Sequence, residues 1–370
     1  MTDSLLTIDR FVPHISTVPA NKGQTVGLFL REKISARTHA DLGRTSPPVV
    51  LFVHGGFAPA VVAFDLAYKD GRFSYMAALA RKGFDVFAIT HTGYGSSPKP
   101  MMDDPCNIDA AFQHLVIPHV LNRPMPPRYP FKLVSSRTEW DEIETVVRFI
   151  RELRGVERIS FVAWSTGVPR AGGFAALYPD EVDKLVFFGP APYQPNDAPP
   201  VPMPEPGAPT ILQTREFLLQ NRWGADVRCD GQLDDPGVQD AVWRALMEQD
   251  GLGASWGADG RGIMRAPNRM NFGWRQNVGK IRAPTLFMLG EFDNYERRLD
   301  AWHGLRVEHK AFVKIRCASH FVQFEQGRHL LHRLTAEWLS HGTVDGKTRG
   351  EFVSDGQEAL QPLGTEAIPG

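Results

Sequence analysis

The chain has few cysteines, almost no net charge and no long apolar run. Its 370 residues include only Cys106, Cys229 and Cys317, which are far apart and lack metal-binding spacing. We interpret all three as free thiols in a reducing compartment. The formal net charge is −1, so the charge balance points neither to nucleic acid nor to an anionic membrane as a partner.

Signals for secretion and membrane insertion are also lacking. The N-terminal residues M-T-D-S-L-L-T-I-D-R carry acidic side chains where a secretory signal carries lysine or arginine, and no apolar core follows. No apolar stretch approaches the roughly 20 residues that span a bilayer. We therefore expect a soluble, cytoplasmic protein; its oligomeric state is left open.

What the sequence does contain is an alternation of strand and helix patterns. Continuous apolar runs are typical of strands in a parallel sheet that is covered on both faces. Between these runs lie amphipathic helical patterns, and two antiparallel strands precede them. The alternation predicts an α/β fold with a mostly parallel central sheet flanked by helices. The strand runs lie at 48–57, 84–90, 159–163, 184–188, 283–293 and 311–315, the helices at 73–82, 138–153, 166–177 and 325–339, and the antiparallel pair at 8–16 and 25–31.

The alternation stops after the sixth strand, where a proline-rich loop is followed by helical patterns at 211–222 and 238–249. We predict a helical cap inserted into the core at this point. The last residues are polar and without periodicity, which indicates weak order. The predicted units are the first part of the core (1–189), the cap (190–282), the second part of the core (283–340) and a weakly ordered tail (341–370).

One stretch of the core carries a candidate nucleophile. Residues 159–173 read I-S-F-V-A-W-S-T-G-V-P-R-A-G-G, an apolar run followed by X-Ser-X-Gly and a helix-compatible segment. This pattern is typical of a strand that turns sharply into a helix with a serine, here Ser165, at the corner. Ala163 stands where the first glycine of G-x-S-x-G usually lies. Taken alone, the motif also fits an ordinary strand-to-helix loop.

Five motifs occur in an order that identifies a family. They are V-H-G-G-F (53–57), T-H-T-G-Y-G-S-S (90–97), A-W-S-T-G (163–167), L-G-E-F-D (289–293) and S-H-F-V-Q-F-E (319–325). Together they resemble the alpha/beta-hydrolase superfamily, in its serine-nucleophile branch with a cap insert, over roughly residues 25–340. Because the nucleophile is serine, the resemblance disfavours the haloalkane dehalogenases and epoxide hydrolases, which use aspartate there.

The resemblance implies a role for several side chains. Ser165 would be the nucleophile, His320 the base that takes its proton, and Asp293 the acid that orients the histidine. Glu291 is the competing acid. By the same analogy His54 supports the His-Gly-Gly loop, whereas we expect His329 and His332 on the surface of the last helix.

The oxyanion hole would use the backbone N–H of Thr166 and that of Gly56, with Phe57 as the alternative to Gly56. The chemistry needs no cofactor, and no metal-binding motif is present. Part of the aromatic and sulfur side chains around the serine and in the insert would line an apolar substrate pocket, and the rest would form a minor core. The candidate substrate-binding residues are Trp164, Trp223, Trp243, Met270, Phe272 and Trp274.

These features predict a serine hydrolase that cleaves a carboxylic ester or lactone of a bulky, largely apolar small molecule through an acyl-enzyme. The same fold and triad also serve C–C bond hydrolysis, acyl transfer and biosynthetic cyclisation, and the sequence does not separate these reactions. A non-catalytic ligand-binding member is a third possibility, and it would be expected to have lost part of the triad. No nucleic-acid or membrane partner is predicted.

Overall fold

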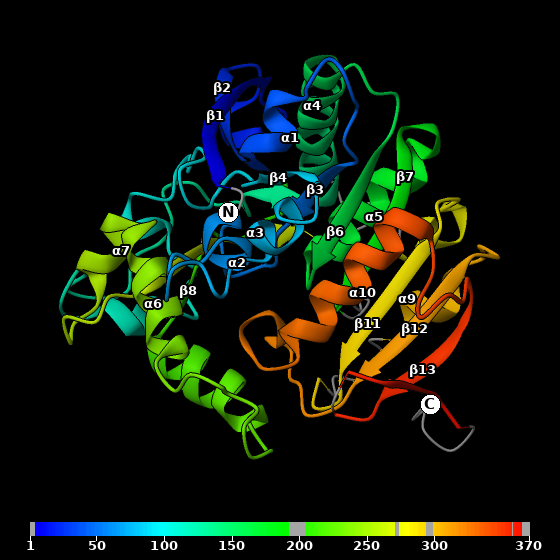
Figure 1. The fold of residues 1–370 in the computed structure, drawn as a ribbon. Helices are drawn as coiled ribbons and strands as arrows, with labels where there is room; N and C mark the ends of the chain where they lie inside the picture. The colour runs from blue at the N-terminus through cyan, green and yellow to red at the C-terminus, as the bar shows by residue number, and fades with distance from the viewer. Residues whose placement is uncertain (1–3, 192–203, 271–273, 294–298, 357, 365–370) are drawn as a thin grey trace.

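The computed structural model of the protein describes residues 4–191, 204–270, 274–293, 299–356 and 358–364. A large twisted sheet forms its centre, with strand order β1-β2-β4-β3-β6-β7-β11-β12-β13-β14 (Figure 1). The pairs from β4 to β13 are parallel, whereas β1–β2, β2–β4 and β13–β14 are antiparallel. The strands are β1 (Leu5–Ile15), β2 (Thr25–Ser35), β3 (Val49–Val53), β4 (Asp85–Ile89), β6 (Ile159–Trp164), β7 (Val182–Phe188), β11 (Thr285–Gly290), β12 (Lys310–Ile315), β13 (Gly350–Ser354) and β14 (Leu360–Pro362).

Helices cover both faces of this sheet (Figure 1). Successive side chains of a strand point to opposite faces, so Phe52 of β3 packs on one side and Leu51 and Val53 on the other. One face packs against α2 (Ala60–Phe64), α3 (Tyr75–Ala80) and α10 (Arg328–His341). The other packs against α4 (Ser136–Arg154), α5 (Gly167–Leu177) and α9 (Asp300–Gly304). The predicted α/β architecture is confirmed.

The insert differs from its prediction in one place. Within the predicted helix over 211–222, β8 (Thr210–Gln213) pairs with β9 (Met264–Pro267), and a π-helix, Phe217–Trp223, follows. Thr210 and Leu212 are buried and alternate with half-buried neighbours, which is the two-residue period of a strand. The second prediction is confirmed by α6 (Val238–Glu248). The remaining elements here are α7 (Gly251–Trp256), β10 (Arg269–Met270), which pairs with β5 (Val134–Ser135), and α8 (Trp274–Asn277).

The predicted weak order of residues 341–370 is wrong for much of that segment. Strand β13 adds to β12 in parallel, and β14 pairs with β13. The side chain of Phe352 is buried in the core, and Ser354 is buried two residues later. Ser354 Oγ also accepts a hydrogen bond from Arg316 N at 2.9 Å, which connects β13 to the end of β12.

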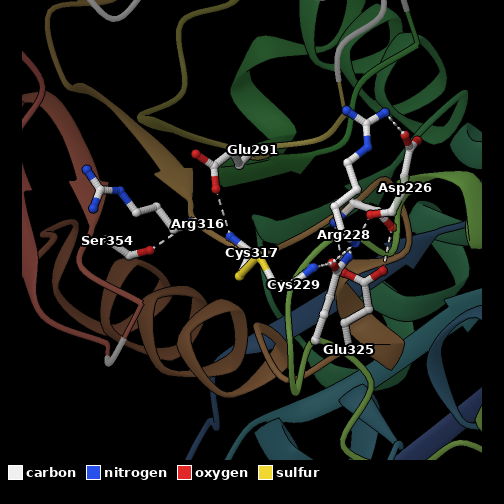
Figure 2. The surroundings of a disulfide bond; sticks show 10 residues. Asp226, Arg228, Cys229, Glu291, Arg316, Cys317, Glu325 and Ser354 are labelled. Atoms are coloured by element: carbon white, nitrogen blue, oxygen red, sulfur yellow. Dashed lines mark hydrogen bonds and ion pairs between the residues drawn. A yellow bond between two sulfur atoms is a disulfide. The ribbon is translucent and has the colours of Figure 1, made fainter.

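The free-thiol interpretation is wrong for two of the three cysteines. Cys229 in the insert and Cys317, three residues before His320, form a disulfide (Figure 2). Cys106 is free, as predicted, and its side chain is buried. The bridge connects positions 88 residues apart in the chain, and it removes the argument for a reducing compartment. Among the described residues, no helix has both the length and the apolar composition needed to cross a membrane.

The disulfide gives a direct chemical prediction. Unfolded in denaturant without a reductant, the chain should take up one iodoacetamide, at Cys106, because the other two sulfurs are bonded to each other. After reduction it should take up three. Intact mass spectrometry counts the adducts, and three adducts before reduction would show that the bond is absent in the purified protein.

Candidate active site

Ser165 lies on a sharp turn between β6 and α5. Its φ of 56° is in the left-handed region, which few non-glycine residues occupy without a functional reason. The turn is fixed by hydrogen bonds from Ser165 N to Phe188 O (3.2 Å) and from Val168 N to Ser165 O (3.0 Å). A Cβ at Gly167 would lie only 2.2 Å from Val53 O, so the close approach of helix and strand requires glycine there.

Three side chains from separate loops meet at this turn. His320 Nε2 lies 3.0 Å from Ser165 Oγ, and His320 Nδ1 lies 3.0 Å from Asp293 Oδ2. Asp293 follows β11 and His320 follows β12, and both are buried. Because the carboxyl ends of parallel strands share one edge of the sheet, residues distant in the chain come together. The hydrogen-bonded order is the one that nucleophilic activation of a serine requires.

The backbone at Gly189 packs closely against His320 and Asp293. Gly189 follows β7 directly and has a φ of 49°, and a Cβ there would lie 3.0 Å from His320 Nδ1 and 3.1 Å from Asp293 Oδ2. The competing acid Glu291 is engaged elsewhere, since its Oε2 accepts a hydrogen bond from Cys317 N at 3.0 Å (Figure 2). The geometry therefore favours Asp293 as the partner of His320.

The loop that carries His320 is held by buried hydrogen bonds that the sequence did not reveal. Trp164 Nε1 donates to His320 O at 2.9 Å. Glu325 accepts from Ser319 N (2.8 Å) and Ser319 Oγ (2.5 Å), and also from Trp223 Nε1 (2.9 Å). Burial raises the pKa of Glu325. Glu325 lies within the S-H-F-V-Q-F-E motif, but only the fold shows what its carboxyl group contacts.

The predicted substrate-binding residues that the structure describes are packed in the interior. Trp223 is fully buried and stacks on Phe321, with ring centroids 4.9 Å apart. Trp243 is buried and donates through Nε1 to Arg261 O at 2.7 Å, and the Met270 sulfur accepts from Glu205 N at 3.3 Å. Their contact with a substrate stays a prediction, as it does for Trp164. Phe272 and the side chain of Trp274 lie outside the described part of the structure.

The oxyanion loop, which we define as residues 54–57, passes directly beside the serine. A Cβ at Gly55 would lie 3.0 Å from Ser165 Cβ, and one at Gly56 would lie 3.3 Å from Thr166 Oγ1. Among the described residues, the backbone N–H groups of Gly56, Phe57 and Thr166 donate no hydrogen bond to another backbone group. These N–H groups are available as the predicted donors, and their role stays a prediction.

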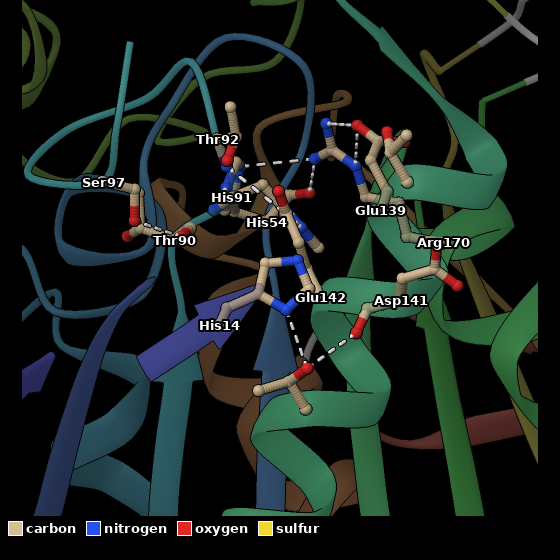
Figure 3. Close-up of polar contacts among 12 residues, drawn as sticks. His14, His54, Thr90, His91, Thr92, Ser97, Glu139, Asp141, Glu142 and Arg170 are labelled. Atoms are coloured by element: carbon tan, nitrogen blue, oxygen red, sulfur yellow. Dashed lines mark hydrogen bonds and ion pairs between the residues drawn. The ribbon is translucent and has the colours of Figure 1, made fainter. Parts of the chain in front are cut away.

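A buried polar network lies behind this loop (Figure 3). His54 Nδ1 donates to Gly55 O at 2.7 Å, and His54 Nε2 accepts from His91 N at 3.1 Å, which together define a neutral imidazole. Burial and the nearby Arg170 lower the pKa of His54 well below its ordinary value. His91 Nδ1 lies 2.7 Å from Glu142 Oε2. His54 thus supports the loop, as the resemblance implied.

Glu142 should make stability depend on pH. Burial raises its pKa to about 7 in the folded protein, so the folded state binds this proton more tightly than the unfolded chain. Ionisation of Glu142 is therefore harder in the folded protein than in the unfolded chain. It lowers the free energy of unfolding as the pH rises from the unfolded pKa near 4.5 through 7. The unfolding free energy of Glu142→Gln minus that of the wild type should therefore increase by roughly 3 kcal/mol over this interval. Urea titrations at several pH values measure it, and a pH-independent difference would contradict the effect.

The prediction that His332 lies on the surface of the last helix is wrong. His332 of α10 is buried, with its ring 4.3 Å from that of Tyr75. Burial lowers its pKa to about 3, so it is neutral in the folded protein. The side chain lies on the face of α10 that packs against α3.

Comparison with known proteins shows which fold family this chain belongs to. A sequence profile described as the alpha/beta hydrolase fold matches residues 48–326, while no curated protein matches the sequence significantly. A thermophilic esterase from Thermogutta terrifontis is similar in structure, with a TM-score of 0.52 at 15% identity over 90% of this chain and 98% of its own. A serine hydrolase involved in carbazole degradation, the CarC enzyme, has a TM-score of 0.51 at 15% identity, with 90% of this chain and 99% of its own covered. A serine hydrolase of the polyaromatic hydrocarbon-degrading bacterium Cycloclasticus zankles has a TM-score of 0.50 at 15% identity, with 92% of this chain and 100% of its own covered. At such identities the likeness concerns the fold, and the profile match over most of the chain shows that this protein belongs to the alpha/beta hydrolase fold family.

Proposed function

We propose that this protein is a serine hydrolase that cleaves a carboxylic ester or lactone through an acyl-enzyme. The observation that carries the proposal is the hydrogen-bonded series of Ser165, His320 and Asp293, with 3.0 Å at each step. Membership of the alpha/beta hydrolase fold family supports it. In this chain all three side chains lie where parallel strands of the sheet end. A chain that had become only a ligand-binding protein would have no reason to keep this geometry.

The mechanism follows from the positions of the atoms. His320 Nε2 takes the proton of Ser165 Oγ as the oxygen attacks the carbonyl carbon, and Asp293 stabilises the imidazolium that forms. The N–H groups of Gly56 and Thr166 donate to the oxyanion of the tetrahedral intermediate. His320 then protonates the leaving alkoxide, which leaves the acyl group on Ser165. Water that His320 deprotonates attacks the acyl carbonyl. The bond from the carbonyl carbon to Ser165 Oγ then breaks as His320 returns the proton to Oγ, and the carboxylic acid departs.

A largely apolar substrate fits the surroundings of the histidine. The His320 ring packs beside two aromatic side chains that also contact each other, with its centroid 5.4 Å from that of Trp164 and 5.5 Å from that of Phe321. Apolar surfaces of this kind favour hydrophobic acyl or alcohol groups. We therefore expect aromatic or longer-chain esters and lactones to be better substrates than acetates.

The acyl-enzyme can be tested with several esters of one carboxylic acid. If all pass through the same acyl-Ser165, hydroxylamine added to the reaction should divide the product between acid and hydroxamate in one constant ratio, whatever the alcohol. A ratio that changes with the leaving group would reject the common intermediate. Labelling of Ser165 by a fluorophosphonate without turnover of any ester or lactone would reject ester hydrolysis and favour C–C bond hydrolysis, acyl transfer or cyclisation.

A further inference from the structure

We propose that Arg170 and Glu139 are positioning residues for oxyanion stabilisation, because they hold and polarise the peptide groups of the oxyanion loop. The inference rests on the proposed function, since it assigns a task to side chains behind the same site. Neither residue belongs to the triad or supplies an oxyanion donor.

The guanidinium of Arg170 is fully buried and binds two kinds of partner (Figure 3). Its Nε and Nη2 donate to Glu139 Oε1 at 2.9 and 2.6 Å. Its Nη1 donates to two backbone carbonyls of the oxyanion loop, His54 O at 2.8 Å and Gly55 O at 3.2 Å. The planar fork of a guanidinium has N–H groups in fixed directions, so anchoring one edge on a carboxylate aims the other at the loop.

The bound carbonyls determine where the N–H groups of the loop point. In a trans peptide the C=O and the N–H of the same unit point in opposite directions. Gly55 O belongs to the peptide unit that contains the N–H of Gly56, and both Arg170 and His54 bind that oxygen. The N–H of Gly56 is consequently directed away from the guanidinium. This loop lies against Ser165 and Thr166, where an oxyanion would form.

A positive charge on the carbonyl side does more than fix the orientation. A hydrogen bond from a charged donor withdraws electron density from the peptide unit, and linked hydrogen bonds strengthen one another in a buried site. The N–H of Gly56 should therefore be a stronger donor than that of an ordinary peptide. His54 is neutral and binds the same oxygen, so it can contribute orientation but no charge.

Glu139 is the carboxylate partner that stabilises the buried positive charge of Arg170. A buried guanidinium is costly without a carboxylate partner. Burial alone would raise the pKa of Glu139, but Arg170 and Arg269 outweigh it and lower the pKa to about 2. Glu139 Oε2 also accepts from Arg269 Nη2 at 2.5 Å. Arg269 lies in β10, so the insert is tied to the same carboxylate.

The test measures Arg170→Met, Arg170→Lys, Glu139→Gln and a control variant with a p-nitrophenyl ester and with a fluorophosphonate. Arg170→Met should lower kcat by about 10- to 100-fold, somewhat less than the loss of a whole oxyanion donor, with KM changed little. Arg170→Lys keeps the charge but loses the fork, so its kcat should lie between those of the wild type and Arg170→Met. The rate of phosphonylation of Ser165 should fall in the same order, because the phosphoryl oxygen occupies the oxyanion site.

Arg154→Met is the matched control. Arg154 is also a nearly buried arginine with carboxylate partners, Asp85 and Glu32, but it lies at the far end of the sheet and binds no carbonyl of the oxyanion loop. It should lower stability while leaving kcat within about twofold of the wild type, because it makes no contact with a group that stabilises transition-state charge.

Two results would overturn the proposal: a folded Arg170→Met with unchanged kcat, or a change confined to KM. If Arg170→Met does not fold, Arg170→Lys and Glu139→Gln decide, since a wild-type kcat and phosphonylation rate in both would reject it. A wild-type protein that neither reacts with the fluorophosphonate nor hydrolyses esters would reject the proposed function itself. If the wild type is labelled but cleaves no ester, the phosphonylation rates alone decide the role of Arg170.

Discussion

Replacing Ser165 by alanine is expected to lower kcat for ester hydrolysis by roughly 10⁴- to 10⁶-fold. Ser165 Oγ is the atom 3.0 Å from His320 Nε2, and Ser165 lies half-buried, with a φ of 56°, at the turn between β6 and α5. Without the hydroxyl no acyl-enzyme can form, and only the oxyanion donors and substrate binding remain to accelerate attack by water. Steady-state kinetics on the best ester of the panel gives the magnitude.

Ser160→Ala is the control for this substitution. Ser160 lies five residues earlier, on β6, and is buried. Its hydroxyl donates to Asp183 Oδ2 at 3.2 Å. Its loss should leave kcat nearly unchanged. If Ser165→Ala retained more than about one hundredth of the wild-type kcat, the observed hydrolysis would not proceed through Ser165.

Replacing Asp293 by asparagine is expected to lower kcat by about 10⁴-fold. Asp293 Oδ2 accepts the Nδ1–H of His320 at 3.0 Å, which leaves Nε2 unprotonated toward Ser165. An amide NH₂ facing Nδ1 would favour the opposite tautomer, in which Nε2 carries the proton and cannot act as the base. The shape of the side chain is preserved, so the protein should remain folded.

Glu291→Gln distinguishes the two candidate acids. Glu291 Oε2 accepts from Cys317 N at 3.0 Å, and a glutamine oxygen can accept the same hydrogen bond. This variant should keep kcat within about threefold, because its amide oxygen keeps the hydrogen bond from Cys317 N and Glu291 is not the residue bonded to His320. The reverse ranking of the two variants would move the acid from Asp293 to Glu291.

The sequence predicts most of the central sheet because its strands are continuous apolar runs. Strand β3 contains only apolar residues, and β6 has a single polar residue, Ser160, among six. The same reasoning missed β13, since Phe352 and Ser354 are too few inward-facing positions to form a recognisable pattern. It also predicted helix at β8, where a four-residue strand precedes a π-helix and the short apolar run fits both periods.

The three residues of the hydrogen-bonded series were found from the order of the motifs, because each follows a predicted strand at the same edge of the sheet. The contacts that support these three residues could not be found in this way. Arg170 and Glu139 are single charged residues on two helices, and their pairing depends on how α4 packs against α5. The bond between Cys229 and Cys317 likewise depends on the path of the insert, because no local spacing connects residues so far apart.

The most direct test of the account is intact-mass analysis after treatment with a fluorophosphonate. The wild type should gain a single adduct, Ser165→Ala should gain none, and His320→Ala should react far more slowly because Nε2 no longer takes the serine proton. Ser160→Ala should be labelled like the wild type. A folded wild-type protein that gains no adduct, or an adduct that persists in Ser165→Ala, would contradict the assignment of Ser165 as an activated nucleophile.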